Sequence, residues 1–371
     1  MKSKSRYQVN WKTILMVGSA YASYNIGAGF ATGQEILQFF GAYGSNHVYL
    51  GVLVSMGLTF YFTASCYMAG QSEKFHQASD CYEYYCGKHA GRFFDGFVLL
   101  FILGILVVMF AGSGVMAENF FDVSPITGEI IMGVISGIVV LAGLKNIKQV
   151  LGITGIILVL YLVLTGVYAI ATKGFDLELA TENLQEYINQ GVVLQAGIFG
   201  VSHWFLSAVS YSGFCLIISI PLLISLGQST RNQQEAFSAG IFSSLFFHGA
   251  ILLVSFAILL NLDEVVKIGI QIPTFSAIQN MIPGISWSFG FILMIGIFTS
   301  IIGYLWMLSE RFTKEGSLQS KGLIVLLILF GVMGGTLFPF NKLVNLLYPF
   351  AGLMGILFMM FILLKDMKKN I

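Results

Sequence analysis

Charged side chains are scarce in this sequence. Only 10% of its 371 residues are Asp, Glu, Lys or Arg, whereas a soluble globular chain carries about 25%. The 19 Lys and Arg residues nearly balance the 18 Asp and Glu residues, so the chain has no basic field that would attract a nucleic acid. The scarcity of charge excludes an ordinary water-exposed surface and a nucleic-acid partner.

Cysteines and catalytic motifs are also sparse or missing. The four cysteines, Cys66, Cys81, Cys86 and Cys215, are too few and too scattered for a disulfide framework. The sequence contains neither an H-E-x-x-H metalloprotease motif nor a G-x-x-x-x-G-K-[ST] phosphate-binding loop. We therefore expect no enzyme activity, no nucleotide partner and no cofactor.

Apolar residues are abundant instead, at 56% of the chain. They form long continuous runs, and about 20 such residues are enough to cross a bilayer as a helix. A membrane barrel would show alternating segments of about ten residues. The sequence therefore predicts an all-α polytopic membrane protein with ten transmembrane helices. The predicted spans cover residues 13–39, 47–70, 93–118, 126–143, 149–172, 194–226, 233–260, 285–310, 321–338 and 342–364.

The basic residues predict how these spans are oriented. With ten spans, sixteen of the 19 basic residues fall on the side of the N-terminus, and only Lys173, Lys267 and Lys342 fall on the other side. Basic loops tend to stay in the cytoplasm. We therefore expect a cytoplasmic N-terminal segment at 1–12 and a cytoplasmic tail at 365–371.

The spans divide into two equal halves, 13–172 and 194–364, joined by an external connection at 173–193. Five spans in each half give the halves opposite orientations, and the first span of each half is interrupted by small or polar residues near its middle. This pattern is typical of inverted repeats with broken helices at a substrate site. The connection at 173–193 is expected to form a short helix, and 261–284 a hairpin that caps a cavity; a plain loop is the alternative for each.

The middle of the first span is rich in glycine. Gly27, Gly29 and Gly33 lie within seven residues, and each costs a helix about 1 kcal/mol relative to alanine. A break near Gly27–Gly29 would free amides that suit a carboxylate and carbonyls that suit a cation. Close helix packing at the glycines is the alternative, but the polar neighbours Asn25 and Glu35 favour a ligand site.

Two motifs resemble a known group of transporters. The run I-G-A-G-F at 26–30 resembles the first-helix glycine motif of the amino acid–polyamine–organocation (APC) superfamily, and A-V-S-Y-S-G-F at 208–214 resembles its sixth-helix motif. Residues 27–40 look still more like the YkvI-type bacterial membrane proteins. The resemblance implies a LeuT-type fold of two inverted five-helix repeats, with helices 1 and 6 broken, in the bacterial cytoplasmic membrane. Many relatives carry an acid where this chain has Cys215, so recognition of an amine at that position is in doubt.

By resemblance, a small solute binds between the first and sixth spans, and the third and eighth spans complete the pocket. The expected substrate is an amino acid, an amine or a related metabolite. For His203 the alternative is a hydrogen-bonded packing role. The expected substrate-binding residues are Asn25, Gly27, Ala28, Gly29, Phe30, Phe110, Ser113, His203, Ser207, Ser210, Tyr211, Ser212 and Phe214.

The eighth span carries a possible sodium site. In sodium-coupled LeuT-type carriers a Thr-Ser pair in this span joins carbonyls of the first unwound segment, and Thr299 and Ser300 match that pair. The implied ligands are the carbonyls of Ser23, Ile26 and Gly296 together with these two hydroxyls. Hydroxyls that bond their own helix are the alternative, and proton coupling competes with sodium coupling.

Glu35 is the only acid that we place well inside a span. A charge there costs at least about 2.5 kcal/mol on insertion scales, so a cavity or a partner is expected. Glu35 is a candidate gate, proton carrier or ligand for a substrate amine; a structural, hydrogen-bonded acid is the alternative.

The sequence thus predicts a secondary active transporter that works by alternating access, with Na⁺ as coupling ion, as a monomer or weak homo-oligomer. The alternatives are a proton-coupled carrier and an APC-like receptor subunit that senses a ligand without transport.

Overall fold

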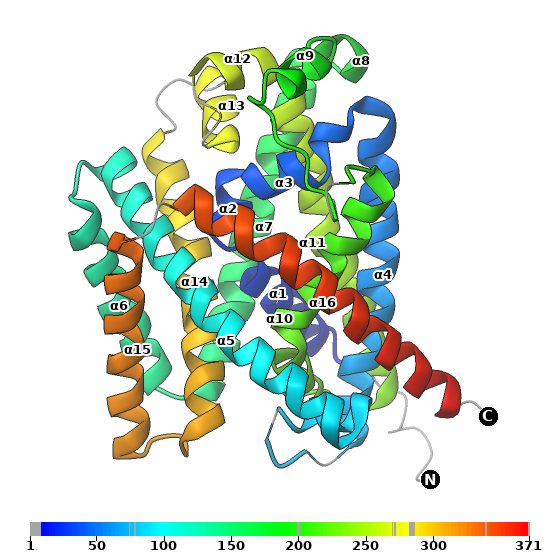
Figure 1. The fold of residues 1–371 in the computed structure, drawn as a ribbon, viewed down its shortest axis with the longest axis vertical. Coiled ribbons are helices and arrows are strands. Elements are labelled where there is room, and N and C mark those ends of the chain that lie inside the picture. Colours follow the sequence, from blue (N-terminus) through cyan, green and yellow to red (C-terminus); the bar gives the residue numbers. More distant parts are fainter. Residues whose placement is uncertain are drawn as a thin grey trace.

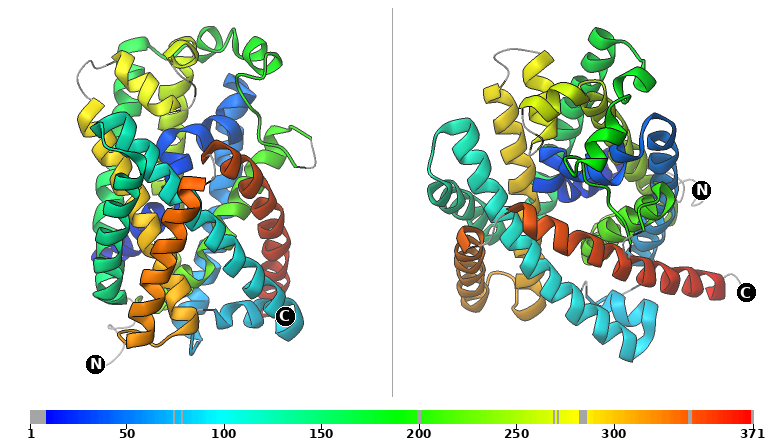
Figure 2. Two further views of the ribbon diagram at one scale, coloured as in Figure 1. Left: turned by 60° about the vertical axis from the view of Figure 1, so that its left-hand side comes forward. Right: turned by 45° about the horizontal axis from the view of Figure 1, so that its top comes forward.

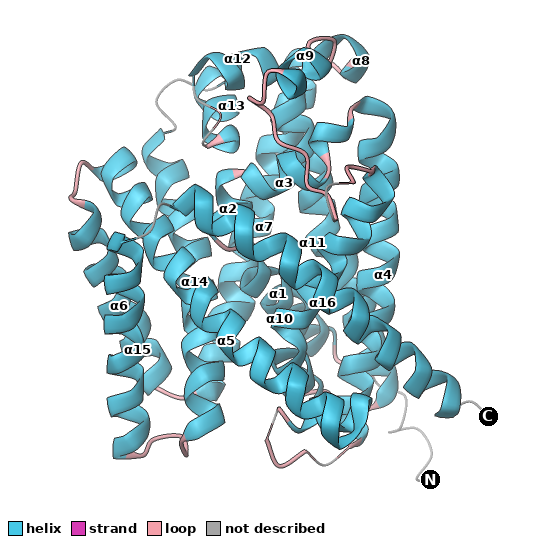
Figure 3. Ribbon diagram, in the orientation of Figure 1, coloured by secondary structure: helices cyan, strands magenta, loops and turns pink. Residues whose placement is uncertain are grey.

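The structure, a computed structural model, is all-helical in the residues that it describes, apart from one isolated bridge between Ile198 and Val201 (Figure 3). The described residues are 9–73, 75–77, 79–198, 201–268, 270, 272–281, 286–337 and 340–369. Parts of the predicted segments therefore lie outside them, among them 1–8 and 370–371 at the termini and 282–285 before the predicted eighth span.

Eight described helices are long and apolar enough to cross a membrane. They are α4 (Ser45–Ser72), α5 (Asp80–Phe121), α7 (Leu144–Lys173), α10 (Trp204–Gly227), α11 (Gln233–Leu259), α14 (Ser286–Phe312), α15 (Leu318–Leu337) and α16 (Phe340–Lys369). A ninth, α6 (Pro125–Leu141), is apolar but has only 17 residues. These helices have the lengths and composition of a multi-pass membrane protein, while the predicted total of ten spans stays a prediction.

The region predicted as the first span contains three helices. They are α1 (Trp11–Asn25), α2 (Ala28–Thr32) and α3 (Gln34–Phe39). Gly27 is extended between the first two, and Gly33 has a φ of +84° between the second and third. A positive φ is accessible to glycine at little cost, so the glycine-rich sequence explains why the chain can turn here without leaving the core.

The sixth predicted span begins later than expected. The helix α10 starts at Trp204, not at 194, because the preceding backbone bonds to the end of α3 instead: Ala196 donates its amide to Gln38 O at 3.0 Å. The helix then continues through residues 208–214, so the interruption expected near its middle does not lie there. The non-helical stretch that precedes α10 contains residues 192–198 and 201–203 among the described residues.

Short helices gather at the end of the molecule opposite the two termini (Figure 1). The connection at 173–193 contains two of them, and the described part of 261–284 contains two more. They are α8 (Leu177–Ala180), α9 (Leu184–Asn189), α12 (Leu262–Ile268) and α13 (Pro273–Met281); a short 3₁₀ turn, η2 (Gly41–Tyr43), follows α3.

The helices differ in how deeply they are enclosed. In α10, 94% of the most apolar stretch is buried inside the protein, whereas in α15 the share is 22%. The helix α10 packs against α1, α4 and α16, and α6 and α15 lie together at one edge (Figure 2). The centre of the protein is therefore formed by α1, α2 and α10.

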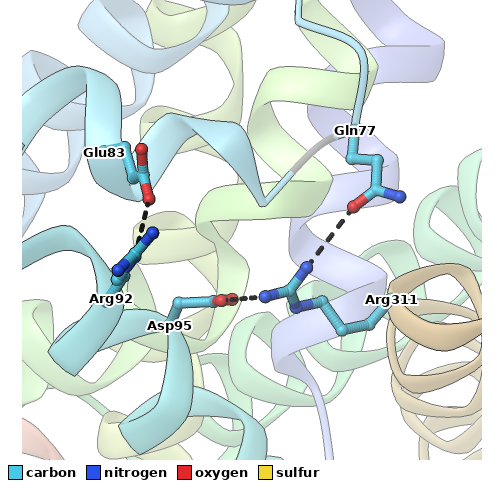
Figure 4. A network of polar contacts seen from close by, with 5 residues as sticks. All are labelled: Gln77, Glu83, Arg92, Asp95 and Arg311. Carbon is cyan, nitrogen blue, oxygen red and sulfur yellow. Dashed lines mark hydrogen bonds and ion pairs between the residues drawn. The ribbon is translucent and has the colours of Figure 1, made fainter. Parts of the chain in front are cut away.

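A polar network ties two long helices together (Figure 4). Arg311 of α14 pairs with Asp95 of α5 and donates to Gln77 Oε1 at 3.4 Å. Within α5, Arg92 Nε lies 3.5 Å from Glu83 Oε1. The pair between Arg311 and Asp95 joins α14 to α5, while the pair within α5 is exposed and contributes little stability.

Candidate functional site

The gap between α1 and α2 frees two carbonyl groups. In a continuous helix the carbonyls of Ser23 and Tyr24 would accept bonds from the amides four residues later. Instead the amide of Gly27 donates to Asn25 O at 3.0 Å, and the next amide lies 3.3 Å from the sulfur of Met109 in α5. Both carbonyls therefore lack their usual helical partners.

The two hydroxyls of α14 meet these carbonyls. Thr299 Oγ1 donates to Ser23 O at 3.0 Å, and Ser300 Oγ donates to Tyr24 O at 3.0 Å. Each hydroxyl also lies within hydrogen-bond distance of Gly296 O, at 2.8 and 3.3 Å. All these groups are buried, so neutral oxygen atoms from two helices gather at one point away from water.

Gly296 allows α14 to approach the gap closely. A Cβ at this position would lie only 3.0 Å from Ile26 O, which is tighter than side chains normally tolerate. The structure therefore brings together the residues predicted for sodium, with Tyr24 as an additional carbonyl. Unwound carbonyls and helix ends of this kind coordinate small cations in transporters. The gathered residues are Ser23, Tyr24, Ile26, Gly296, Thr299 and Ser300.

Glu35 lies on the other side of α2, with its carboxylate fully inside the protein. Tyr211 OH of α10 donates to Glu35 Oε1 at 2.8 Å. Glu35 Oε2 is 2.7 Å from the position of a Cβ on Gly29, and the Tyr348 hydroxyl is 3.1 Å from the same position. The Tyr348 ring in turn stacks on Phe214, with centroids 4.4 Å apart. Gly29 is thus needed for the close approach of an acid and a tyrosine to α2.

A cavity of about 300 Å³ borders this carboxylate. It lies between α3, the non-helical stretch before α10 and the first third of α16, and both Glu35 and Tyr348 line it. Glu35 is only 2% exposed, and this cavity provides space beside its carboxylate for water or a solute. A buried acid beside a cavity and a hydroxyl donor is suited to binding a cation or a proton.

An aromatic cluster encloses the same region. Phe30 of α2 packs on Phe247 of α11, with ring centroids 5.4 Å apart, and Phe247 lies nearly parallel to Tyr211 at 6.4 Å. Phe30, Tyr211 and Phe214 were all predicted at the substrate site, and the structure places the three around the α2 region.

Several other predicted residues bind neighbouring helices instead. Asn25 Nδ2 donates to Ser219 Oγ of α10 at 3.1 Å, which ties the end of α1 to α10. Ser207 Oγ donates to the last carbonyl of α3 at 2.9 Å. Ser210 faces α16, where its Oγ is 2.1 Å from the Cβ position of Gly352. These side chains position α10 and do not line the cavity beside Glu35.

Ser212 belongs to a separate buried network. Its Oγ lies 2.8 Å from Ser55 Oγ of α4, and Ser55 Oγ lies 2.8 Å from His248 Nε2 of α11. The other ring nitrogen of His248 lies 3.1 Å from Ser244 O. This network joins three helices and satisfies the polar atoms of a buried histidine.

Three predicted residues lie away from the site. His203 is exposed at the start of α10, where its Nδ1 accepts the amide of Phe205 at 3.2 Å and caps the helix. Phe110 packs its ring against Gly331 of α15 and points away from α2, because Met109 takes the face of α5 that meets the gap. Ser113 Oγ donates to Phe110 O at 2.7 Å, within its own helix.

Two residues of the candidate site were not predicted from the sequence, Met109 and Tyr348. For the third span we predicted Phe110 and not the adjacent Met109. Tyr348 was not predicted because it lies far along the chain from the other site residues. The sequence signal for it was the pair Tyr348-Pro349 in the middle of an apolar run. A second buried acid is Glu129, in the first turns of α6, which is also 2% exposed. Glu129 lies within the predicted span 126–143, so the sequence already placed this acid in a membrane helix.

Two bacterial proteins of similar length resemble the chain along most of its sequence. It is 24% identical over 341 residues to the uncharacterized membrane protein YkvI of Bacillus subtilis (strain 168), covering 91% of this chain and 92% of that protein. It is 25% identical over 352 residues to the uncharacterized protein YyaD of the same organism, covering 95% of each. No family model matches the sequence. The resemblance to YkvI-type proteins is confirmed.

Solved structures of transporters share the fold. A Na⁺-coupled sialic acid symporter matches with a TM-score of 0.62 at 13% identity, over 87% of this chain and 74% of that one. MhsT in complex with L-phenylalanine matches with a TM-score of 0.62 at 15% identity, over 93% of this chain and 87% of that one. Mhp1, a nucleobase-cation-symport-1 family transporter, matches with a TM-score of 0.59 at 14% identity, over 92% of this chain and 76% of that one. The chain is a multi-pass membrane protein of LeuT-type fold, and these structural neighbours are transporters.

Proposed function

We propose that this protein is a secondary active transporter of a small organic solute, coupled to sodium and working by alternating access. The observation that carries the proposal is the set of buried oxygens at the gap between α1 and α2, where Thr299 and Ser300 of α14 meet carbonyls released from α1. A sodium ion would replace the hydrogen bonds of these hydroxyls and hold α14 against α1. Its binding would then favour one arrangement of the two helices over another.

The proposed substrate site lies beside the same gap. The amide at Ala28 now meets the sulfur of Met109, a weak acceptor, so a substrate carboxylate would displace Met109 and gain a stronger bond at the start of α2. The ring of Phe30 and the carboxylate of Glu35 would meet the rest of the solute. An amino acid or related metabolite has this combination of groups.

The arrangement of the basic residues supports the proposed topology. Lys12 and Lys148 line one cavity at the start of α1 and α7, and Lys173 lies 3.7 Å from Glu264 of α12 near the opposite end. We propose that the first end is cytoplasmic, with ten spans in two inverted repeats, 13–172 and 194–364. Helix 1 would be broken at Gly27 and helix 6 before Trp204.

Uptake into proteoliposomes tests the proposal. A thermal-shift screen of amino acids and amines first identifies a ligand, and uptake of that labelled ligand is then measured with an inward sodium gradient and with potassium in its place. Uptake should require sodium, and a rate that is the same in both salts would contradict sodium coupling.

The variant Thr299→Ala with Ser300→Ala tests the proposed ion site. We expect the sodium concentration for half-maximal uptake to rise about tenfold or more, since one charged contact of ~1.5 kcal/mol corresponds to a factor of about ten. The matched control is Ser309→Ala with Thr313→Ala, which removes another hydroxyl pair, 3.3 Å apart, at the C-terminal end of α14 and just beyond it. If both variants keep the wild-type sodium response, Thr299 and Ser300 do not bind the ion.

Proton coupling is the second candidate, and the buried carboxylate of Glu35 beside a cavity favours it. Sodium-independent uptake that is driven by an inward proton gradient and lost in Glu35→Gln would select this candidate.

A further inference from the structure

A groove lies between α4, α11 and α16, far from the gap in α1. Its volume is about 410 Å³. The apolar part of the lining comes from side chains such as Phe60 and Met68 of α4 and Phe237 of α11, and the polar end from Tyr84 and Asp366. The helix α16 reaches the groove with its last turns, at the end of the molecule that carries the two termini (Figure 1).

The groove is continuous with surfaces that face lipid. On α4 the exposed residues Leu50, Leu53 and Tyr61 follow helical spacing and lead into it. On α11 Phe237 and Leu245 do the same. Apolar side chains exposed on a membrane helix contact acyl chains, so an occupant of this groove would have an apolar body that extends along α4 and α11.

The polar end of the groove is lined by an acid, and a base contacts one of the lining residues. Asp366 Oδ2 accepts hydrogen bonds from Ser65 Oγ at 2.7 Å and from Tyr61 OH at 3.2 Å. Among the described residues both bonds go to Oδ2, so Oδ1 is the oxygen open to a ligand. Lys365 Nζ lies 4.4 Å from the centre of the Tyr84 ring. Tyr84 and Asp366 both line the groove, so the ammonium of Lys365 lies against a residue of the same polar end.

We propose that this groove binds a phospholipid whose head group carries a primary amine. The ammonium group would meet Asp366 Oδ1, the phosphate would meet Lys365, and an acyl chain would lie against Phe60 and Phe237. The charges of Asp366 and Lys365 distinguish this head group from those of other phospholipids. An anionic head group without an amine places a negative charge near Asp366, and a choline head group has no N–H to donate.

Lipid binding here would act on the packing of α16. Tyr61 and Ser65 belong to α4 and Asp366 to α16, so the head group would add a contact at the place where these two helices already meet. The bound lipid should therefore stabilise the folded protein.

The experiment uses the full chain, purified in detergent and depleted of lipid. Phosphatidylethanolamine, phosphatidylglycerol or phosphatidylcholine of the same acyl chains is added back, and retained lipid is counted by native mass spectrometry alongside the thermal unfolding midpoint. We expect phosphatidylethanolamine to be retained most and to raise the midpoint most. Equal retention of the three lipids would overturn the proposal.

Two variants locate the contact. Asp366→Asn keeps an acceptor for Tyr61 and Ser65 but removes the charge, and it should weaken phosphatidylethanolamine binding about tenfold or more, as expected for one charge-assisted bond. The matched control is Asp122→Asn, at the C-terminal cap of α5, which should retain the wild-type preference. Lys365→Gln should weaken the retention of all three lipids, because each carries the phosphate that would meet Lys365.

Two results would overturn the assignment of the groove. The first is an Asp366→Asn variant that still prefers phosphatidylethanolamine as strongly as the wild type. The second is a dimer in the mass spectrum that disappears in Asp366→Asn while lipid retention is unchanged, which would make the groove an interface between two copies. Neither result bears on transport, so the lipid proposal and the proposed function fail independently.

Discussion

Glu35 and Glu129 are both acids inside the helical bundle, and each is 2% exposed, but their surroundings differ. Glu35 has a hydroxyl donor in Tyr211 and borders a cavity. Glu129 is wedged between helices: its Oε1 is 2.7 Å from the Cβ position of Gly114, and its Oε2 has no hydrogen-bond partner among the described residues.

This difference shows that burial alone does not identify a functional acid. A membrane acid has a function when a ligand or an ion can reach it and when neighbouring groups respond to its charge. Glu35 meets both conditions, because it stands beside a cavity and beside the start of α2. Glu129 lines none of the cavities described above, and close glycines on α5 and α15 account for its fit.

The largest expected effect comes from Glu35→Gln. This change keeps the size of the side chain and removes its charge, so uptake of the identified ligand should fall about tenfold to a hundredfold, the cost of losing a charged contact of ~1.5–3 kcal/mol. The free energy of unfolding should stay equal or rise, because a buried acid is costly in a membrane.

Its control is Glu118→Gln, at an exposed position of α5, which should leave uptake unchanged. Wild-type uptake in Glu35→Gln would show that Glu35 has only a structural role. The proposed functional difference between Glu35 and Glu129 would then be wrong.

A smaller effect is expected from Tyr211→Phe, which removes the donor to Glu35 Oε1. The folded protein should lose about 1–3 kcal/mol of stability, measured by denaturant or thermal unfolding, and uptake should fall several-fold. The exposed Tyr168→Phe serves as control. In the Glu35→Gln background the same change should cost less; an equal cost would show that the two side chains act independently.

The smallest effect is expected from Glu129→Gln. Uptake should stay within about twofold of wild type and the free energy of unfolding should change by less than about 1 kcal/mol, since no hydrogen bond to Oε2 is lost. A tenfold loss of uptake would show that Glu129 takes part in transport, and the proposed difference between Glu35 and Glu129 would then be wrong.

Much of the architecture could be read from the sequence. The scarcity of charge and the long apolar runs predicted an all-helical membrane protein, which is confirmed, and the glycine motif predicted the LeuT-type fold of the neighbours. The ten-span count and the repeat boundaries stay predictions. The start of α10 was missed by ten residues, because the stretch before it is apolar like a helix but bonds to α3 instead.

The residues that form the candidate sites could be predicted only in part from the sequence. Thr299 and Ser300 could be named because they match the Thr-Ser pair that the resemblance to sodium-coupled LeuT-type carriers implies in this span. Phe110 was chosen where Met109 is the residue that meets the gap, because successive residues of a helix point about 100° apart and an apolar sequence does not reveal which direction faces the centre.

The sequence by itself determined which segments are helical, where α1 can end and which polar groups are available inside the membrane, because these properties depend on local composition and on glycine. Only the tertiary structure decided that Tyr348 reaches the same glycine as Glu35, that His203 lies at the surface, and that Glu129 is as buried as Glu35. These outcomes depend on how helices hundreds of residues apart pack, and packing selects among faces that look equally apolar along the chain.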